Sequence, residues 1–180
     1  MTVLPIVLAP DRLLKTPCRP VGRVDASVRR LMDDMLETRY AAPGVGLAAP
    51  QVGVLKRVIV ADVAHDDEPP APLRLADPEI VWTSDEQAVT SEGCLSLPEI
   101  YVDVTRPVAV RVRFLDEHGE TREIEAEDLL ARCLQHEIDH LNGVLHVDYL
   151  SHLKRTMILR RLAKQKPQPG SASGRERAAS

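Results

Sequence analysis

The sequence predicts a protein that combines α-helices and β-strands in one domain, with most of the strands lying between two helices. Three observations predict this class. Residues 25–42 and 126–141 carry apolar side chains at helical spacing, and segments between them show the alternation or short apolar runs of strands. The chain of 180 residues is long enough for one domain with a sizeable core.

The composition disfavours several classes of protein. Apolar residues make up 44% of the chain and aromatic residues only 3%, so we expect a core of Val, Leu, Ile and Ala. The net charge of −4 argues against a general nucleic-acid binder, and no apolar run approaches the roughly 18–20 residues of a membrane span. The start resembles no signal peptide, and three cysteines fit a reducing compartment. We expect a cytoplasmic protein with no membrane and no sequence-specific nucleic-acid partner.

An extended arm and a helix are expected in the first 42 residues. Four prolines within residues 1–24 disfavour a helix there. Asp25 suits an N-cap, and the residues after it follow a helical rhythm to about Ala42. The apolar positions of this helix are Val28, Leu31, Met32, Met35, Leu36 and Tyr40.

A segment of small residues, 44–53, follows Pro43. Glycine and alanine at this density indicate a backbone that another group approaches closely. A phosphate-binding loop is disfavoured, because no strand precedes the glycines and no Gly-Lys-Ser/Thr follows them. Gln51 is the single polar side chain here, and it is either a satisfied loop amide or an oriented hydrogen-bond donor.

Short strands are expected through the middle of the chain. Residues 64–72 are rich in proline and acidic side chains and should form a surface loop. Residues 116–119 should form a hairpin turn. Around these two segments, strands are expected at residues 57–62, 73–76, 80–83, 87–91, 101–105, 108–115 and 121–125.

The helix expected at residues 126–141 carries the most informative motif, with His136, Glu137 and His140. Histidines four residues apart lie one turn apart on the same helix face and can bind one metal ion. A glutamate beside the first histidine can take a proton from water, which is typical of a hydrolytic metalloenzyme. Two solvated histidines would give the same spacing. That alternative is disfavoured, because the helix also has an apolar inner side formed by Leu129, Leu130, Cys133, Leu134 and Leu141.

A catalytic metal site needs a third protein ligand and an open fourth position. The candidates are Cys94, Cys133, Asp139, His146 and other carboxylates. Cys133 lies three residues before the first histidine, but it is better suited to packing in the core. Cys94 is better placed, because glycine and proline flank it in a turn-like run at residues 92–98.

The C-terminal part of the chain is basic. A third helix is expected at residues 151–164. From residue 154 onward the chain contains eight basic residues and one acidic residue. This region could face ribosomal RNA, although a solvated tail is the preferred interpretation. The Gly-, Ser- and Pro-rich stretch after Pro167 is expected to be disordered. We therefore expect one domain at residues 1–166 and a tail at residues 167–180.

Three segments together resemble the signature motifs of the peptide deformylase family. They are residues 44–51 (GVGLAAPQ), 92–96 (EGCLS) and 136–141 (HEIDHL), in the family's order and at its usual separations. The resemblance extends over about residues 3–165. It implies an α+β fold, with mixed and antiparallel sheets around a central helix that bears the histidine pair. It also implies a hydrolase that removes the formyl group from N-terminal formylmethionine of newly made polypeptides and releases formate.

The resemblance implies a metal centre in which Cys94, His136 and His140 hold one divalent ion and water takes the fourth position. The family's ion is usually Fe²⁺, and Zn²⁺, Ni²⁺ and Co²⁺ also occupy the site. One sulfur and two nitrogen ligands suit several first-row ions, so the residue types leave the metal's identity open.

The resemblance also assigns catalytic roles. Glu137 takes the proton of the attacking water and later passes it to the departing amine. The side-chain amide of Gln51 and the backbone N–H of Leu95 stabilise the oxyanion that develops on the formyl group.

Substrate binding is expected to follow the family as well. Its members bind the nascent peptide as an added β-strand, so backbone groups near Val45, Gly46 and Gly93 should pair with the substrate. Val45, Leu95 and Cys133 should line an apolar pocket for the methionine side chain. Apart from the substrate, the ribosome is a possible partner, through the basic C-terminal helix.

The sequence departs from the family's pattern at five positions, which bear on pocket shape and substrate preference rather than on reaction type. They are Arg39, Asp77, Thr90, Arg132 and His146.

Two alternatives to a deformylase differ in what they predict. A zinc peptidase should cleave an unformylated peptide internally. A metal-stabilised module that only docks on ribosomes would need no base and no oxyanion donor, and it is disfavoured because Gln51, Cys94 and Glu137 occur together.

Overall fold

The computed structural model describes residues 1–65 and 67–165. Its helices are α1 (Ala26–Tyr40), α2 (Asp128–Leu141) and α3 (His152–Gln165), and 3₁₀ helices span Arg12–Lys15, Ala49–Val52 and His146–Tyr149. Its strands are β1 (Gly46–Ala48), β2 (Val58–Ala61), β3 (Leu73–Thr83), β4 (Gln87–Cys94), β5 (Leu97–Pro107), β6 (Ala109–Leu115) and β7 (Thr121–Glu127). The tail expected at residues 167–180 lies outside the described residues.

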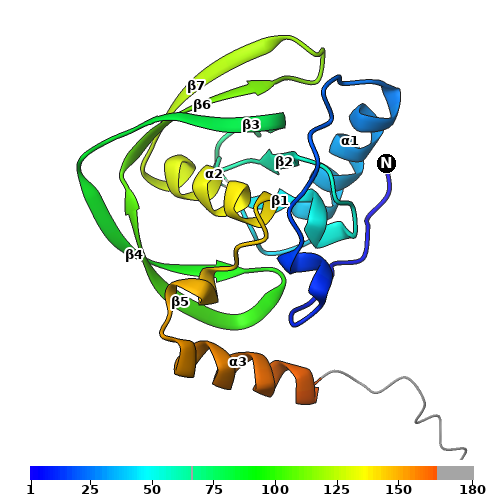
Figure 1. Cartoon of the computed structure of the whole chain (residues 1–180). Coiled ribbons are helices and arrows are strands. Elements are labelled where there is room, and N and C mark those ends of the chain that lie inside the picture. Colours follow the sequence, from blue (N-terminus) through cyan, green and yellow to red (C-terminus); the bar gives the residue numbers. More distant parts are fainter. Residues whose placement is uncertain (66, 166–180) are drawn as a thin grey trace, which may run out of the picture.

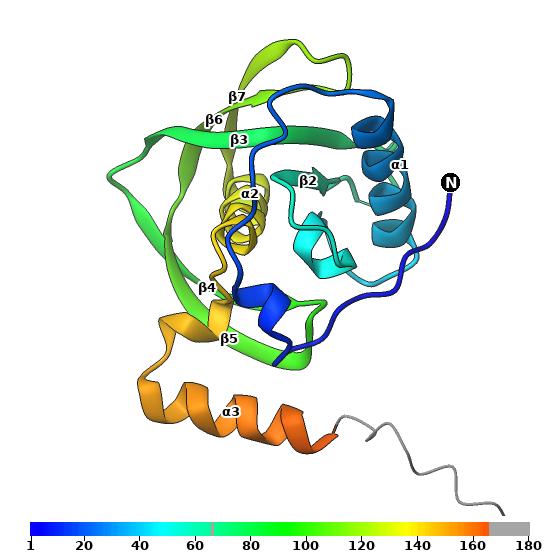
Figure 2. The same cartoon turned by 45° about the vertical axis from the view of Figure 1, so that its right-hand side comes forward.

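Two sheets surround α2 (Figure 1). The larger sheet has the order β1-β2-β3-β6-β7, and the smaller one is the β4–β5 hairpin. The named strands pair antiparallel, and one isolated parallel bridge joins Arg19 to Lys56. Figure 2 shows α2 between β3, β6 and β7 above and the hairpin below. The predicted α+β class, with sheets packed around the histidine-bearing helix, is confirmed.

The large sheet is covered on both faces by helices. Successive side chains of a strand point to opposite faces. In β2, Ile59 and Ala61 therefore join the cluster that contains the apolar side of α2, whereas Val58 and Val60 join the cluster that contains α1. A third cluster ties the β4–β5 hairpin to the N-terminal arm and to the segment after α2. This packing fixes the orientation of α2 about its own axis.

The predicted helix at residues 126–141 begins two residues too early. Ala126 and Glu127 continue β7, where they pair with Val110 and Ala109. Asp128 then turns the chain with a φ of 49°. The sheet and the helix compete for the same backbone groups, so α2 starts only where the sheet pairing ends.

Other predicted boundaries also differ. Residues 73–76 and 80–83 belong to one strand, β3, because bulges shift its register without ending the pairing with β6. The arm at residues 1–24 contains a 3₁₀ turn at Arg12–Lys15. The small-residue segment includes strand β1, which pairs with β2.

The expected N-cap of α1 is confirmed, because the Asp25 carboxylate accepts a hydrogen bond from Val28 N at 2.9 Å. The helix ends at Tyr40 rather than near Ala42, and the C-terminal helix spans His152–Gln165. Within the described part of the chain, no helix combines the length and apolar character needed to cross a bilayer.

Candidate functional site

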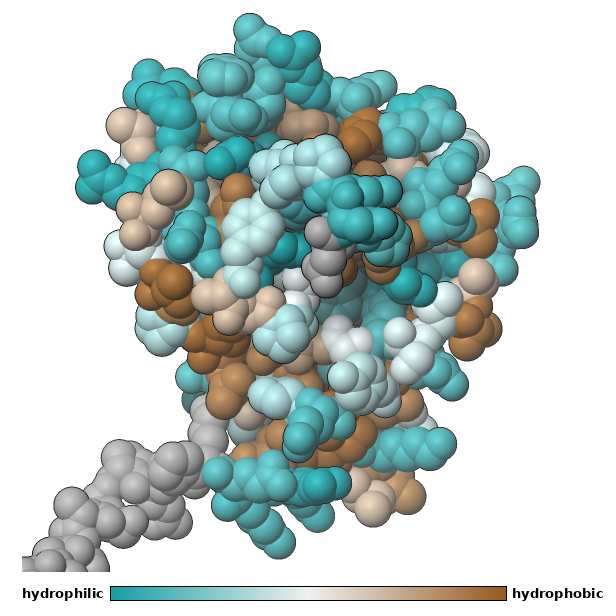
Figure 3. Space-filling model, turned by 180° about the vertical axis from the view of Figure 1, so that it is seen from behind, coloured by the Kyte–Doolittle hydropathy of each residue, from teal (hydrophilic) through white to brown (hydrophobic). Residues whose placement is uncertain are grey.

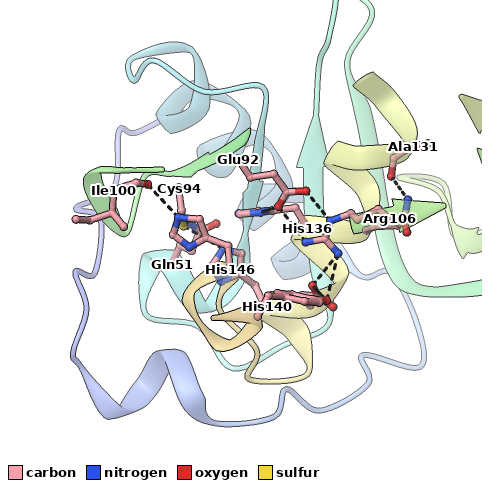
Figure 4. A network of polar contacts seen from close by, with 12 residues as sticks. Gln51, Glu92, Cys94, Ile100, Arg106, Ala131, His136, His140 and His146 are labelled. Carbon is pink, nitrogen blue, oxygen red and sulfur yellow. Dashed lines mark hydrogen bonds and ion pairs between the residues drawn. The ribbon is translucent and has the colours of Figure 1, made fainter. Parts of the chain in front are cut away.

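The predicted metal ligands meet between α2 and the β4–β5 hairpin (Figure 4). Cys94 ends β4 and pairs with Leu97 across a tight turn, which brings its thiol towards α2. One ligand atom from each of Cys94, His136 and His140 lies within 4.8 Å of the others. Cys94 Sγ is 3.3 Å from His140 Nε2. One thiol and two imidazoles at this separation suit a first-row divalent ion.

A chain of buried ionic contacts orients His136. Its Nδ1 lies 3.0 Å from Glu92 Oε2. Arg106 donates to both oxygens of Glu92, at 2.6 and 3.0 Å, and to Asp139 at 3.0 Å. Burial opposes the charge of Glu92, but hydrogen bonds from His136 and Arg106 outweigh burial and lower its pKa to about 2. Because Nδ1 is engaged by a carboxylate, Nε2 of His136 is left to face the cluster.

The electrostatics of the cluster favour a bound cation. Burial lowers the pKa of His136, but hydrogen bonds to Cys94 and Glu92 and the charge of Glu137 raise it to about 10. A divalent ion would meet the same electron-rich groups. Burial and the nearby charge of His136 lower the pKa of His140 well below its ordinary value, so its ring is neutral and suited to ligation. The residues present therefore fit a metal ion.

Glu137 lies beside the cluster and is 5% exposed. Its Oε2 has no hydrogen-bond partner within residues 1–65 and 67–165. Burial raises the pKa of this carboxyl to about 7, although the charge of His136 acts in the opposite direction. A carboxyl with this pKa can both take up and release a proton near neutral pH.

Gln51 is held in one orientation within the 3₁₀ helix that follows β1. Its Oε1 accepts a hydrogen bond from Ala48 N at 2.9 Å, so its Nε2 points the other way, 3.2 Å from Ser96 Oγ and 3.6 Å from Cys94 Sγ. The side chain is 2% exposed. The amide is therefore hydrogen-bonded at both ends, and its Nε2 also lies towards the ligand cluster.

The cluster borders a cavity of about 670 Å³. Its walls come from residues 42–46, from the β4–β5 hairpin and from one side of α2. Every residue predicted from the sequence for substrate binding or catalysis lines it, namely Val45, Gly46, Gln51, Gly93, Leu95, Cys133 and Glu137. Gly46 is needed in this wall, because a Cβ there would lie 2.6 Å from Glu137 Oε1 and 2.7 Å from Cys133 Sγ.

The other candidate ligands lie outside the cluster. Cys133 is a buried wall residue, and Asp139 pairs with Arg106. His146 is buried beside His136, and its Nε2 is 3.0 Å from the carbonyl oxygen of Ile100. Sequence reasoning missed Arg106 as a supporting residue. The alternation of buried and exposed residues along β5 could have identified Arg106, because this arginine occupies a position where a buried apolar residue is expected.

Known proteins resemble this chain over most of its length. A family model described as polypeptide deformylase matches residues 3–156. The chain is 57% identical over 167 residues to a peptide deformylase of Methylocella silvestris, covering 91% of this chain and 85% of the relative. It is 52% identical over 164 residues to that of Rhizobium meliloti, covering 91% and 94%. The crystal structure of an Ehrlichia chaffeensis peptide deformylase in complex with actinonin has a TM-score of 0.87 at 44% identity, covering 92% and 99%.

Proposed function

Because the chain belongs to the peptide deformylase family, we propose that Cys94, His136, His140 and Glu137 carry out the family's reaction in this protein. The reaction is hydrolysis of the formyl group from N-terminal formylmethionine of newly made polypeptides, with release of formate. The supporting observation is the cluster of one thiol and two imidazoles within 4.8 Å, next to a buried carboxyl.

The family is metal-dependent, and we assign Cys94, His136 and His140 as the ligands of one divalent ion. When bound, such an ion lowers the pKa of water and polarises a carbonyl group. We propose Fe²⁺ as the physiological ion, with Zn²⁺, Ni²⁺ or Co²⁺ as possible replacements. Elemental analysis of protein purified without air tests this proposal, and zinc as the single metal found would contradict it.

The chain's own residues supply proton transfer and charge stabilisation. Glu137 takes the proton of the attacking water and passes it to the departing amine, as its raised pKa allows. Gln51 presents Nε2 towards the cluster, and together with the Leu95 backbone N–H it donates to the oxyanion of the formyl group.

The peptide lies in the cavity as an added strand. Backbone groups of Val45 and Gly46 pair with it on one side, and those of Gly93 pair with it on the other. The methionine side chain packs against Val45, Leu95 and Cys133, which all line the cavity.

Glu137→Gln tests the assigned base. The amide keeps the shape of the side chain but cannot take a proton, so we expect kcat to fall by about a hundredfold to ten-thousandfold while metal content is retained. Formate release from a formylmethionyl peptide and elemental analysis measure the two quantities. Glu125→Gln, on the exposed edge of β7, is the matched control. Undiminished turnover in Glu137→Gln would contradict the role, and internal cleavage of an unformylated peptide would favour a peptidase.

We further propose that the enzyme acts in the cytoplasm and that it visits the ribosome through helix α3. No residue of α3 is fully buried, and Lys154, Arg160, Arg161 and Lys164 are exposed. Figure 3 shows hydrophilic side chains along the lower edge of the molecule, where α3 lies, with hydrophobic residues directly above them. Replacing the four cations by glutamine should weaken co-sedimentation with ribosomes and leave formate release intact. Equal affinity of the wild type and of this variant for ribosomes would contradict the proposal.

A further inference from the structure

Arg132 is an unusual member of the cavity wall. It lies on α2, half-buried, between the apolar Leu129 and the buried Cys133. In residues 1–65 and 67–165, no carboxylate lies within 4.0 Å of its guanidinium. Arg106, the buried arginine nearby, has two carboxylate partners. A half-buried cation beside a cavity gains from an anion that enters it.

None of the described acidic side chains that line the cavity forms an ion pair with Arg132. Glu92 is held by Arg106 and His136, and Glu137 stands at the ligand cluster. Glu99, on the opposite strand β5, is exposed and makes no ion pair with the arginine. Among the described residues Arg132 therefore has no acidic partner, which leaves its guanidinium available to an anionic group of a molecule bound in the cavity.

The position of Arg132 on α2 indicates which part of a bound peptide it meets. It precedes His136 by four residues, which is about 6 Å along the helix. Alternate residues of an extended peptide point to the same side and are about 6.6 Å apart. Because the third side chain points to the same side as the methionine side chain, it faces the wall that contains Cys133 and Arg132, farther from His136 than the methionine side chain.

Building on the proposed function, we propose that Arg132 selects formylmethionyl substrates with an acidic side chain at the third residue. The guanidinium would bind the Asp or Glu carboxylate by charge-assisted hydrogen bonds. The side chain of the second residue points away from α2, so its identity should have little effect on kcat/KM. Arg132 is thus a specificity residue that acts on the substrate rather than on the reacting atoms.

Three formylated tripeptides with amidated C-termini, which carry no α-carboxylate, test the proposal: formyl-Met-Ala-Glu, formyl-Met-Ala-Gln and formyl-Met-Ala-Lys. We expect kcat/KM for the Glu peptide to exceed that for the Gln peptide by about twofold to fivefold, as for a partly exposed ion pair, and the Lys peptide to be poorest. High salt should reduce the preference. Formyl-Met-Glu-Ala controls for position, and calorimetric binding of the unformylated product Met-Ala-Glu gives a readout independent of turnover.

Variants of Arg132 complete the test. Arg132→Gln should remove the preference, Arg132→Lys should retain part of it, and Arg132→Glu should reverse it towards the Lys peptide. Arg111→Gln, on β6 outside the cavity, removes the same charge and should retain the preference in full. Equal rates for the Glu and Gln peptides, a preference at the second residue, or a preference retained in Arg132→Gln would overturn the proposal. Failure of every formylated peptide to release formate would instead contradict the proposed function.

Discussion

Gly46 shows how one residue without a side chain shapes the site. It belongs to β1, whose backbone passes directly over Glu137 and Cys133 on α2. A Cβ at this position would lie less than 3.0 Å from both side chains, so either the strand or the glutamate would have to move. The small-residue segment of the sequence therefore serves a close approach of backbone to catalytic side chain.

Gly46→Ala should reduce catalysis more than stability. We expect kcat/KM for a formylmethionyl peptide to fall by about tenfold to a hundredfold, because displacement of a catalytic group by less than 1 Å is already costly. Gly119→Ala, in the hairpin turn outside the cavity, is the control: its φ of 81° makes the change costly for stability, whereas the nearest atom to the added Cβ is Val24 Cβ at 3.9 Å. Steady-state kinetics and thermal melts separate the two effects. Wild-type kinetics in Gly46→Ala would show that the contact is not needed.

Asp62 illustrates a titrating residue remote from the cluster. Burial raises the pKa of Asp62, but hydrogen bonds from Tyr40 and from the backbone of Ala64 and Ala71 outweigh it, and the pKa is lowered. A lowered folded-state pKa stabilises the protein above the unfolded-state value of about 3.9, and this contribution is lost as pH falls through the folded-state pKa.

Asp62→Asn should therefore destabilise the protein in a pH-dependent manner. At neutral pH the free energy of unfolding should drop by about 1–3 kcal/mol, through loss of charge-assisted hydrogen bonds. As pH falls through the lowered folded-state pKa of Asp62, wild type and variant should converge, because the wild-type carboxylate is also becoming neutral. Urea unfolding at several pH values measures both quantities. A difference in unfolding free energy between wild type and variant that is constant with pH would show that the charge of Asp62 does not contribute.

At the scale of elements, the end of α2 is fixed by contact with the N-terminal arm. Gly143 follows the helix with a φ of 73°, and a Cβ there would lie 2.5 Å from the carbonyl oxygen of Lys15. Cys18 N donates to the carbonyl oxygen of Leu141 at 2.8 Å. The arm thus holds the C-terminal end of the helix that carries both histidines.

Gly143→Ala should be clearly destabilising. A left-handed conformation costs about 1–2 kcal/mol for alanine, and the contact with the arm adds to that cost. Gly22→Ala is the matched control, because Gly22 has a φ of 68° but no atom within 4 Å of the added Cβ. Denaturant titrations should show a larger loss for Gly143→Ala. Equal losses of unfolding free energy in the two variants would show that the N-terminal arm moves aside at little cost.

For the whole molecule, the proposed metal joins two elements that come from different parts of the chain. Cys94 comes from the β4–β5 hairpin, whereas His136 and His140 come from α2, which packs on the large sheet. An ion bound by both parts favours the folded state over the unfolded state.

Removal of the metal should therefore lower the global stability. With free metal at about 100 times its Kd, the loss on chelation should be about 2.7 kcal/mol. Thermal melts with and without chelator, in the absence of air, measure the change in Tm. Cys94→Ser should melt at a temperature that responds less to chelator. A chelator-insensitive wild type would contradict a structural role for the ion.

Much of the site follows from local sequence. Helical spacing alone aligns His136 with His140 and places Glu137 on the half-buried side, because the helix repeat is a property of the backbone. The cap at Asp25 and the hairpin turn at residues 116–119 are likewise set by short-range hydrogen bonding. Spacing alone, however, does not distinguish among the candidate third ligands, and only the turn-like setting of Cys94 and the family resemblance favour this residue.

Only the tertiary structure decided which distant groups meet. The contacts of Glu92 with His136 and Arg106, the passage of Gly46 over Glu137, and the start of α2 at Asp128 all depend on sheet pairing between residues far apart in the chain. Local propensity carries no information about such pairing, because its free energy comes from burial and hydrogen bonds formed only on folding. The sequence alone therefore determined the histidine-glutamate motif and its helix, and the packing of the hairpin against that helix determined the cavity, the oriented amide and the charge on its wall.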